Sequence, residues 1–173
     1  MTEKSAATEQ FTGLILLTGN DRPGIAASLF ETLAPFAIHI IDIEQVVINS
    51  RLILTVLIGA SPAHQSAIEE DLSMCASKLD VDIAILFAKG ELAPIADNLL
   101  KVQISATKLH PQAVALVSKS MTEAGANIQS MARIPAADIT IQIIVSGVTK
   151  SDLDSAIMAL NFEDTTKISV NEK

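Results

Sequence analysis

The strongest candidate for chemistry in this sequence is a short polar stretch, Gly-Asn-Asp-Arg-Pro-Gly, at residues 19–24. It follows an apolar run at residues 14–18 and precedes apolar residues spaced four apart, so it joins a predicted strand to the start of a predicted helix. Backbone N–H groups at a helix start have no internal partner and bind small anions. Glycine also lets a ligand approach the backbone closely. The stretch therefore predicts either a site for a small carboxylate, in which Asp21 answers an ammonium group, or simply a well-capped turn.

The residues expected to contact such a ligand come from this loop and from the start of the following strand. His39 begins that strand and either approaches the pocket or reaches solvent. Gly19 ends the first strand, where a larger side chain is expected to fill the pocket. The candidate ligand-binding residues are Gly19, Asn20, Asp21, Arg22, Pro23, Gly24, Ile25 and His39.

Two patterns that resemble catalytic motifs lack the surroundings that catalysis needs. Asp80 and Asp82 form the DxD pair of haloacid-dehalogenase-type phosphatases, but there the pair follows an apolar strand, and here the apolar run at 83–88 comes after it. Ser105 and Lys108 have the SxxK spacing, which works on one helical turn, whereas this stretch is predicted to end a strand. The three histidines are isolated, without metal-ligand spacing. No catalytic residue, metal or cofactor is therefore expected.

The elements that must position the loop follow the order strand, helix, strand, strand, helix, strand. The strands are predicted at residues 14–18, 38–48, 52–59 and 81–87. The first helix starts at Ile25 and ends before Pro35, because proline cannot continue the hydrogen-bond ladder. A tight turn at residues 49–50 joins the middle strands, and the second helix opens at Ser61.

The apolar pattern recurs 88 residues later along the chain. Pro23 then aligns with Pro111, and Gly19 aligns with Thr107, or with Ala106 if one gap is allowed. The second copy keeps none of the glycines of the loop, which weakens the case for a second ligand site. We expect two units, 13–88 and 99–173, with a linker at 89–98 and a disordered N-terminus at 1–12. The βαββαβ order predicts an α+β protein with two ferredoxin-like units, each an antiparallel sheet with helices on one face.

Composition excludes several classes of partner. The 173 residues are 49% hydrophobic and 3% aromatic, so a core of aliphatic side chains is available but stacking platforms for nucleic acid are not. The net charge is −8, and residues 1–86 hold four basic against eleven acidic residues. Because phosphate backbones and anionic membranes need clustered Lys and Arg, we expect no nucleic-acid or membrane partner.

The single cysteine, Cys75, cannot form an internal disulfide, which favours a reducing, cytoplasmic location. The polar first ten residues do not predict a signal peptide, and no apolar run approaches the roughly 20 residues of a membrane span. Two ferredoxin-like units leave sheet edges and sheet faces to cover, and two-fold pairing is the commonest solution. A homodimer is therefore expected.

The loop and the strands after it resemble a known family. Residues 19–25 resemble the G-x-D-x-P-G-[IV] loop of ACT domains, small amino-acid sensors with the βαββαβ fold. Residues 41–54 are similar to the first ACT domain of bacterial phosphoserine phosphatases that carry two such domains before the catalytic one. The resemblance implies tandem ACT domains that bind a small amino acid, L-serine or glycine, and dimerise to regulate serine biosynthesis.

The catalytic domain of that phosphatase class has no counterpart in these 173 residues. The sequence therefore predicts a non-catalytic regulatory module. The alternative is a stand-alone tandem ACT regulator that acts by protein contact, similar to the glycine-cleavage-system repressor family. The tandem arrangement and the loop fit both hypotheses, whereas residues 42–54 favour the first.

Overall fold

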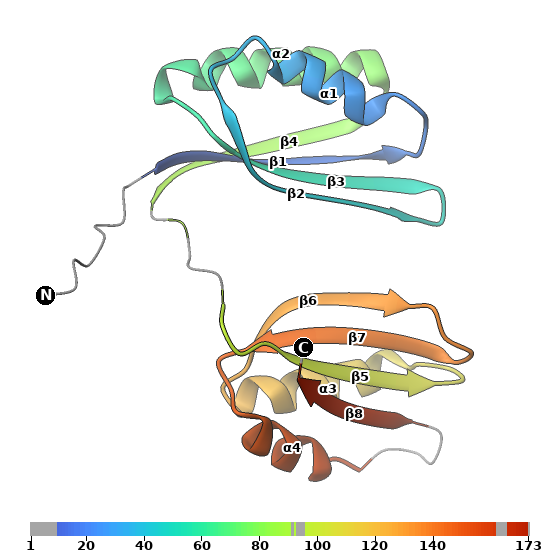
Figure 1. Cartoon of the computed structure of the whole chain (residues 1–173). Helices are drawn as coiled ribbons and strands as arrows, with labels where there is room; N and C mark the ends of the chain where they lie inside the picture. Colours follow the sequence, from blue (N-terminus) through green and yellow to red (C-terminus); the bar gives the residue numbers. More distant parts are fainter. Residues whose placement is uncertain (1–9, 91, 93–95, 162–165, 173) are drawn as a thin grey trace, which may run out of the picture. The chain divides into compact units, whose positions relative to one another are not determined.

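The computed structural model describes the chain except for residues 1–9, 91, 93–95, 162–165 and 173 (Figure 1). The chain divides into two compact units, residues 1–93 and 94–173. Each unit has the predicted βαββαβ order, so the ferredoxin-like fold is confirmed for both.

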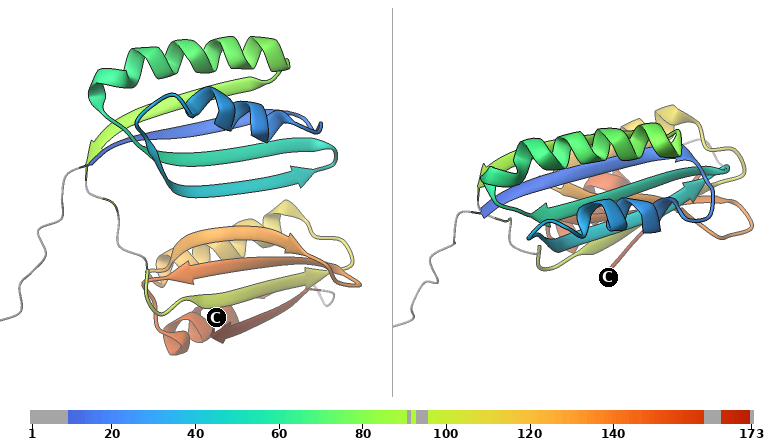
Figure 2. Two further views of the ribbon diagram at one scale, coloured as in Figure 1. Left: turned by 45° about the horizontal axis from the view of Figure 1, so that its top comes forward. Right: turned by 90° about the horizontal axis from the view of Figure 1, so that it is seen from above.

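Unit 1 is a four-stranded antiparallel sheet in the order β2-β3-β1-β4. Helices α1 and α2 lie on the same face of this sheet, as Figures 1 and 2 show. The elements are β1 (Gln10–Asn20), α1 (Ile25–Leu33), β2 (His39–Ile48), β3 (Arg51–Gly59), a 3-10 turn (Pro62–His64), α2 (Gln65–Leu79) and β4 (Asp82–Gly90).

Unit 2 repeats this arrangement with the strand order β6-β7-β5-β8. Its elements are β5 (Leu100–Ala106), α3 (Pro111–Glu123), β6 (Asn127–Ile134), β7 (Ile139–Ser146), α4 (Lys150–Met158) and β8 (Lys167–Glu172). Among the described residues, no helix of either unit is long and apolar enough to cross a membrane.

The strands of unit 1 extend further than the sequence predicts. β1 begins at Gln10, so the expected disorder does not include residues 10–12; residues 1–9 lie outside the described part. The ring of Phe11 stacks on that of Phe87 at 5.3 Å between centroids, and the Phe11 carbonyl accepts a 3.0 Å hydrogen bond from Ala60 N–H. β4 likewise runs on through Lys89 and Gly90, which were expected in the linker, because both pair with β1.

The turns and helix ends follow from local sequence. Asn49 and Ser50 both have positive φ, 48° and 62°, which is the geometry of a two-residue hairpin turn between β2 and β3. Helix α1 ends at Leu33, two residues before Pro35, as predicted. Helix α2 begins at Gln65, after a 3-10 turn that the hydroxyl of Ser61 caps.

Each unit has its own hydrophobic core between sheet and helices. In unit 1, fully buried Ile15 and Leu17 of β1 meet Leu29 of α1 and Ile68 of α2. Alternate residues of each strand face this core, so the other residues of β1, β3 and β4 point to the helix-free face. We call that surface of unit 1 the open face.

Candidate functional site

The loop between β1 and α1 is fixed at both ends by backbone hydrogen bonds. Asp21 N–H donates to the carbonyl of Ser50 at 2.9 Å, which ties the loop to the β2–β3 turn. The Gly24 carbonyl accepts from Ser28 N–H at 2.9 Å and starts the helix ladder. Gly24 has φ +91°, a left-handed conformation that side-chain-bearing residues rarely adopt, so glycine is required where the chain enters α1.

The N-terminus of α1 carries no side-chain cap. Gly24 occupies the N-cap position and makes no side-chain hydrogen bond there, and no acidic residue lies in the first turn. The first N–H groups of a helix have no partner within it. Together with the helix dipole, they form a site of positive potential for a carboxylate.

A hollow of about 340 Å³ opens beside this helix start. Its walls come from the loop, from the first turn of α1 and from the middle strands; they are residues 21–27, Gln45 and Leu52. Asp21 supplies a carboxylate and Gln45 a neutral amide at the same hollow. The site can therefore hold a carboxylate at the helix start and an ammonium group at Asp21, within a volume suited to a small molecule.

Gln45 is the member of this site that the loop motif does not reveal. It is the polar residue between Ile43 and Val47, and it pairs with buried Leu54 on the helix side of the sheet. A glutamine that faces a helix from an otherwise apolar strand position is the signal in the sequence that could have indicated it.

Arg22 belongs to the loop, but its side chain is used elsewhere. Its guanidinium donates to the carbonyl of Leu79 in the last turn of α2. This bond links the loop to the far end of the second helix, so Arg22 acts chiefly as a support for the loop.

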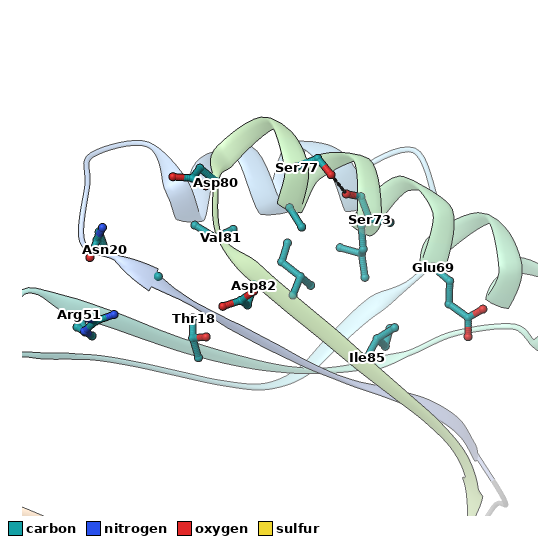
Figure 3. Close-up of a pocket in the computed structure, with 14 residues that line it drawn as sticks. Thr18, Asn20, Arg51, Glu69, Ser73, Ser77, Asp80, Val81, Asp82 and Ile85 are labelled. Atoms are coloured by element: carbon teal, nitrogen blue, oxygen red, sulfur yellow. Dashed lines mark hydrogen bonds between the residues drawn. The ribbon is translucent and has the colours of Figure 1, made fainter.

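Gly19 and Asn20 line a different hollow, of about 460 Å³, between α2 and the strands β1 and β4 (Figure 3). A Cβ atom on Gly19 would lie 2.7 Å from Cγ1 of Val81, so the space that the sequence assigned to a ligand is occupied by a side chain. The absence of a side chain at position 19 allows Val81 to pack at the junction of α2 and β4.

Asp80 and Asp82 also line this second hollow (Figure 3). Asp80 is the left-handed C-cap of α2, with φ 51°, and Asp82 begins β4. The two carboxylates therefore lie on either side of the connection between α2 and β4. Among the described residues, no group of three or more His, Cys, Asp or Glu side chains could hold a metal ion.

Comparison with known proteins identifies the fold around the loop. Residues 12–85 match the family model of the ACT domain. Unit 1 is an ACT domain. Unit 2 shares its topology, and the chain as a whole has the tandem ferredoxin-like arrangement of ACT proteins.

Two relatives found by sequence are named phosphoserine phosphatase. The chain is 32% identical over 148 residues to phosphoserine phosphatase of Streptomyces coelicolor, a match that covers 84% of this chain and 36% of that protein. It is 38% identical over 74 residues to phosphoserine phosphatase SerB2 of Mycobacterium tuberculosis, covering 42% of this chain and 18% of that protein. The chain thus matches about a third or less of the length of these relatives.

Solved structures with the same fold include chains that this one covers almost completely. A "putative glycine cleavage system transcriptional repressor" superposes with a TM-score of 0.75 at 17% identity, covering 95% of this chain and 98% of the other. An unknown protein from Galdieria sulphuraria gives a TM-score of 0.66 at 16% identity, covering 96% and 99%. At these identities the similarity shows the fold.

His39 does not join the loop of the ACT domain. It pairs with Gly59 at the end of β3, and Gly59 also pairs with Thr12 near the start of β1, eight residues before Asn20. At about 3.3 Å per residue, His39 is on the order of 25 Å from the loop. Its imidazole packs on Gly59, where an added Cβ would clash with the ring.

The corresponding loop of unit 2 lacks the features of the site. Helix α3 is capped by its own residue, since His110 Nδ1 accepts from Gln112 N–H at 3.3 Å. Ala106 pairs with Ile139 in unit 2 as Gly19 pairs with Leu52 in unit 1, so Ala106 is the counterpart of Gly19. Two residues further along the chain, Lys108 is then the counterpart of Asp21. The same register places Arg133 opposite Ile141, where unit 1 has Gln45 opposite Leu54. Unit 2 therefore has cations where unit 1 has an acid and an amide.

Proposed function

We propose that this chain is a regulatory module that binds a small amino acid, L-serine or glycine, at the loop of unit 1, and that it acts as a cytoplasmic homodimer. The observation that supports the proposal is the uncapped start of α1, which shares one hollow with Asp21 and Gln45. A free amino acid is a zwitterion, with a carboxylate for the helix N–H groups and an ammonium group for Asp21. The hollow of about 340 Å³ is large enough to hold a free amino acid.

The choice of amino acid is supported by the relatives. One protein named phosphoserine phosphatase matches 84% of this chain and a second matches 42%, and hydrolysis of phosphoserine yields serine. A module that senses this product beside the catalytic domain is suited to feedback control. The buried free Cys75 supports a reducing compartment for the module.

A second candidate is a stand-alone tandem ACT regulator that acts by protein contact. The end-to-end superposition on the "putative glycine cleavage system transcriptional repressor" favours it. The coding sequence distinguishes the two candidates: an open frame that continues from Lys173 into a phosphatase domain favours the first, and a stop codon favours the second.

Calorimetric titration of the wild-type chain with L-serine, glycine, L-alanine and D-serine tests the binding proposal. We expect heat with L-serine or glycine, and a rise in melting temperature, since ligand at 100 times its dissociation constant adds about 2.7 kcal/mol to the free energy of unfolding. Asp21→Asn and Gln45→Leu should each weaken binding by about tenfold or more, because a hydrogen bond to a charged group is worth about 1.5–3 kcal/mol.

Lys108→Asn in unit 2 is the matched control and should leave binding unchanged. Full binding in both unit 1 variants would refute the site. Absence of binding to all four amino acids would refute the sensor and leave a module that only associates.

The proposal assigns no catalysis to these 173 residues. Asp80 and Asp82 end a helix–strand connection, and the apolar strand follows them rather than preceding them. Purified chain should not hydrolyse phosphoserine in the presence of Mg²⁺. Turnover that disappears in Asp80→Asn would contradict this assignment.

A further inference from the structure

The open face of unit 1 carries a band of apolar side chains, which Thr55 of β3 and Thr18 of β1 interrupt. Register aligns Leu57, Leu14 and Leu86 in one row across β3, β1 and β4. The next rows contain Leu16 with Ala84, and Ile53 with Val46 of β2. The exposed large members of the band are Leu14 (47% exposed), Leu16 (41%), Val46 (38%), Ile48 (62%) and Leu86 (69%).

The fold itself does not require this band. In unit 2, Lys101 and Gln103 of β5 occupy the register positions of Leu14 and Leu16. Gln103 pairs with Gln142 and Ser169 across the sheet, and Ser105 bonds Thr140 through their hydroxyls at 2.9 Å. The same sheet position is therefore mainly polar in one unit and apolar in the other, which points to a partner for unit 1.

The size of the band fits a protein interface. The five exposed side chains present roughly 500 Å² of apolar surface, at the upper end of the largest patches on ordinary monomers. Two such faces together reach about 1,000 Å² before the partly buried neighbours Ile53 and Leu57 are included, close to the 1,200 Å² at which stable interfaces begin. A second copy of the same face supplies an apolar surface of matching area.

We propose that two copies of this chain associate through the open faces of their unit 1 sheets, packed face to face. The proposal rests on the homodimer proposed above and names its surface. Aliphatic sheet faces pack at about 10 Å, with interdigitated side chains and strands aligned or crossed. The acidic residues Asp42 and Glu44 lie at one border of the band, where they stay in water.

Charge makes this association dependent on salt. Residues 1–86 hold eleven acidic and four basic residues, so two unit 1 faces repel each other over long range. Salt screens this repulsion, with a Debye length of about 10 Å at 0.1 M. The dimer should therefore tighten as salt is raised, the opposite of an interface held by ion pairs.

Sedimentation equilibrium of the whole chain across micromolar concentrations tests the surface. We expect wild type to dimerise, and Leu16→Lys and Leu86→Lys each to weaken the dimer by about 30-fold or more, the cost of a lost interface anchor. Lysine is chosen because it lowers the net negative charge, so weaker association cannot come from added repulsion. Gln103→Lys, at the matching position of unit 2, is the control and should leave the dimer unchanged.

A third variant separates the open face from the free edge of β2. Val47 is 49% exposed but pairs with buried Leu52, so it lies on the helix side of the sheet. Val47→Lys should leave the dimer intact. Dissociation by Val47→Lys, together with intact dimers of Leu16→Lys and Leu86→Lys, would overturn the face-to-face proposal.

Calorimetric titration of the same variants with L-serine measures amino-acid binding separately from dimerisation. Wild type that stays monomeric would overturn both the dimer and its surface, whereas wild-type dimers that resist both face variants would overturn the surface alone. Circular dichroism spectra that match wild type show that the variants are folded, which Leu86→Lys in particular should satisfy at an edge-strand position that is 69% exposed.

Discussion

The two units share one topology but differ in the two places where a ligand or a partner can approach. In unit 1 the start of α1 is uncapped and the open face is apolar. In unit 2 the start of α3 is capped by His110, and the same sheet face carries Lys101, Gln103 and Ser105. The fold is maintained by the buried residues of both units, so the surfaces are free to diverge. Unit 1 thus concentrates the features expected of binding.

The largest loss of stability is expected for substitutions in the hydrophobic cores of the two units. Leu29 and Val117 are fully buried on the first helices of the two units, in separate clusters. Leu29→Ala should lower the free energy of unfolding of unit 1 by about 2–5 kcal/mol, through lost burial and a cavity. Hydrogen exchange followed by mass spectrometry should show the loss of protection within residues 10–90 only.

The mirror variant Val117→Ala should lower protection in unit 2 and leave unit 1 unchanged. If either substitution lowered protection equally in both units, the cores would not be independent, and the comparison between the units would lose its basis.

The next largest loss of stability is expected at Gly59, on which the imidazole of His39 packs. Gly59→Ala should destabilise unit 1 by about 1–2 kcal/mol, because the new methyl group clashes with the exposed imidazole of His39, which must rotate away. The double variant with His39→Ala should recover most of this loss in a thermal melt. His39→Ala by itself should leave amino-acid binding unchanged. Weaker binding in the titration would indicate that His39 belongs to the ligand site.

Gly19 is a smaller test of the same kind. Its counterpart in unit 2 is Ala106, so the fold accepts a methyl group there, but in unit 1 the space is filled by Val81. Gly19→Ala should cost about 1–2 kcal/mol of stability. Val81→Ala in the same chain should relieve the clash. Chemical denaturation measures the free energy of unfolding of both variants. An unchanged value for Gly19→Ala would contradict the tight packing of Val81 at this junction.

The smallest effect concerns the helix caps. His110→Ala removes the side chain that accepts from Gln112 N–H and should lower the stability of unit 2 by about 0.5–1 kcal/mol. Thr149→Ala at the start of α4 is a reference, since Thr149 Oγ1 accepts from Asp152 N–H at 3.2 Å. Denaturation midpoints compare the two, and an unchanged midpoint in His110→Ala alone would show that the start of α3 does not depend on its cap.

Local signals in the sequence were sufficient for the order of elements. The i, i+4 spacing of Ile25, Leu29 and Leu33 predicts α1, and Pro35 predicts its end. The loop at residues 19–24 was located between strand and helix, where the structure has it. These features depend on neighbours in the chain, which is why they can be predicted without the tertiary structure.

The 88-residue shift that aligns the two units in sequence misplaces some strands by one residue. A shift of 88 matches the helices, as Leu29 with Val117, but strand register matches Leu17 with Ile104 and Leu54 with Ile141, a shift of 87. In a strand, one residue exchanges the two faces of the sheet. The apolar open face of unit 1 is therefore visible only once the pairing is known.

The order of strands and helices, the duplication and the position of the glycine loop all follow from the amino-acid sequence, because each rests on short-range spacing and turn chemistry. Three relations emerge from the folded chain alone: Gln45 lies at the loop, His39 lies at the opposite end of the sheet, and Val81 fills the space at Gly19. Those relations join residues far apart in the chain through strand register and side-chain packing. A long-range pairing of this kind leaves no local pattern in one sequence, since either residue alone is compatible with many partners.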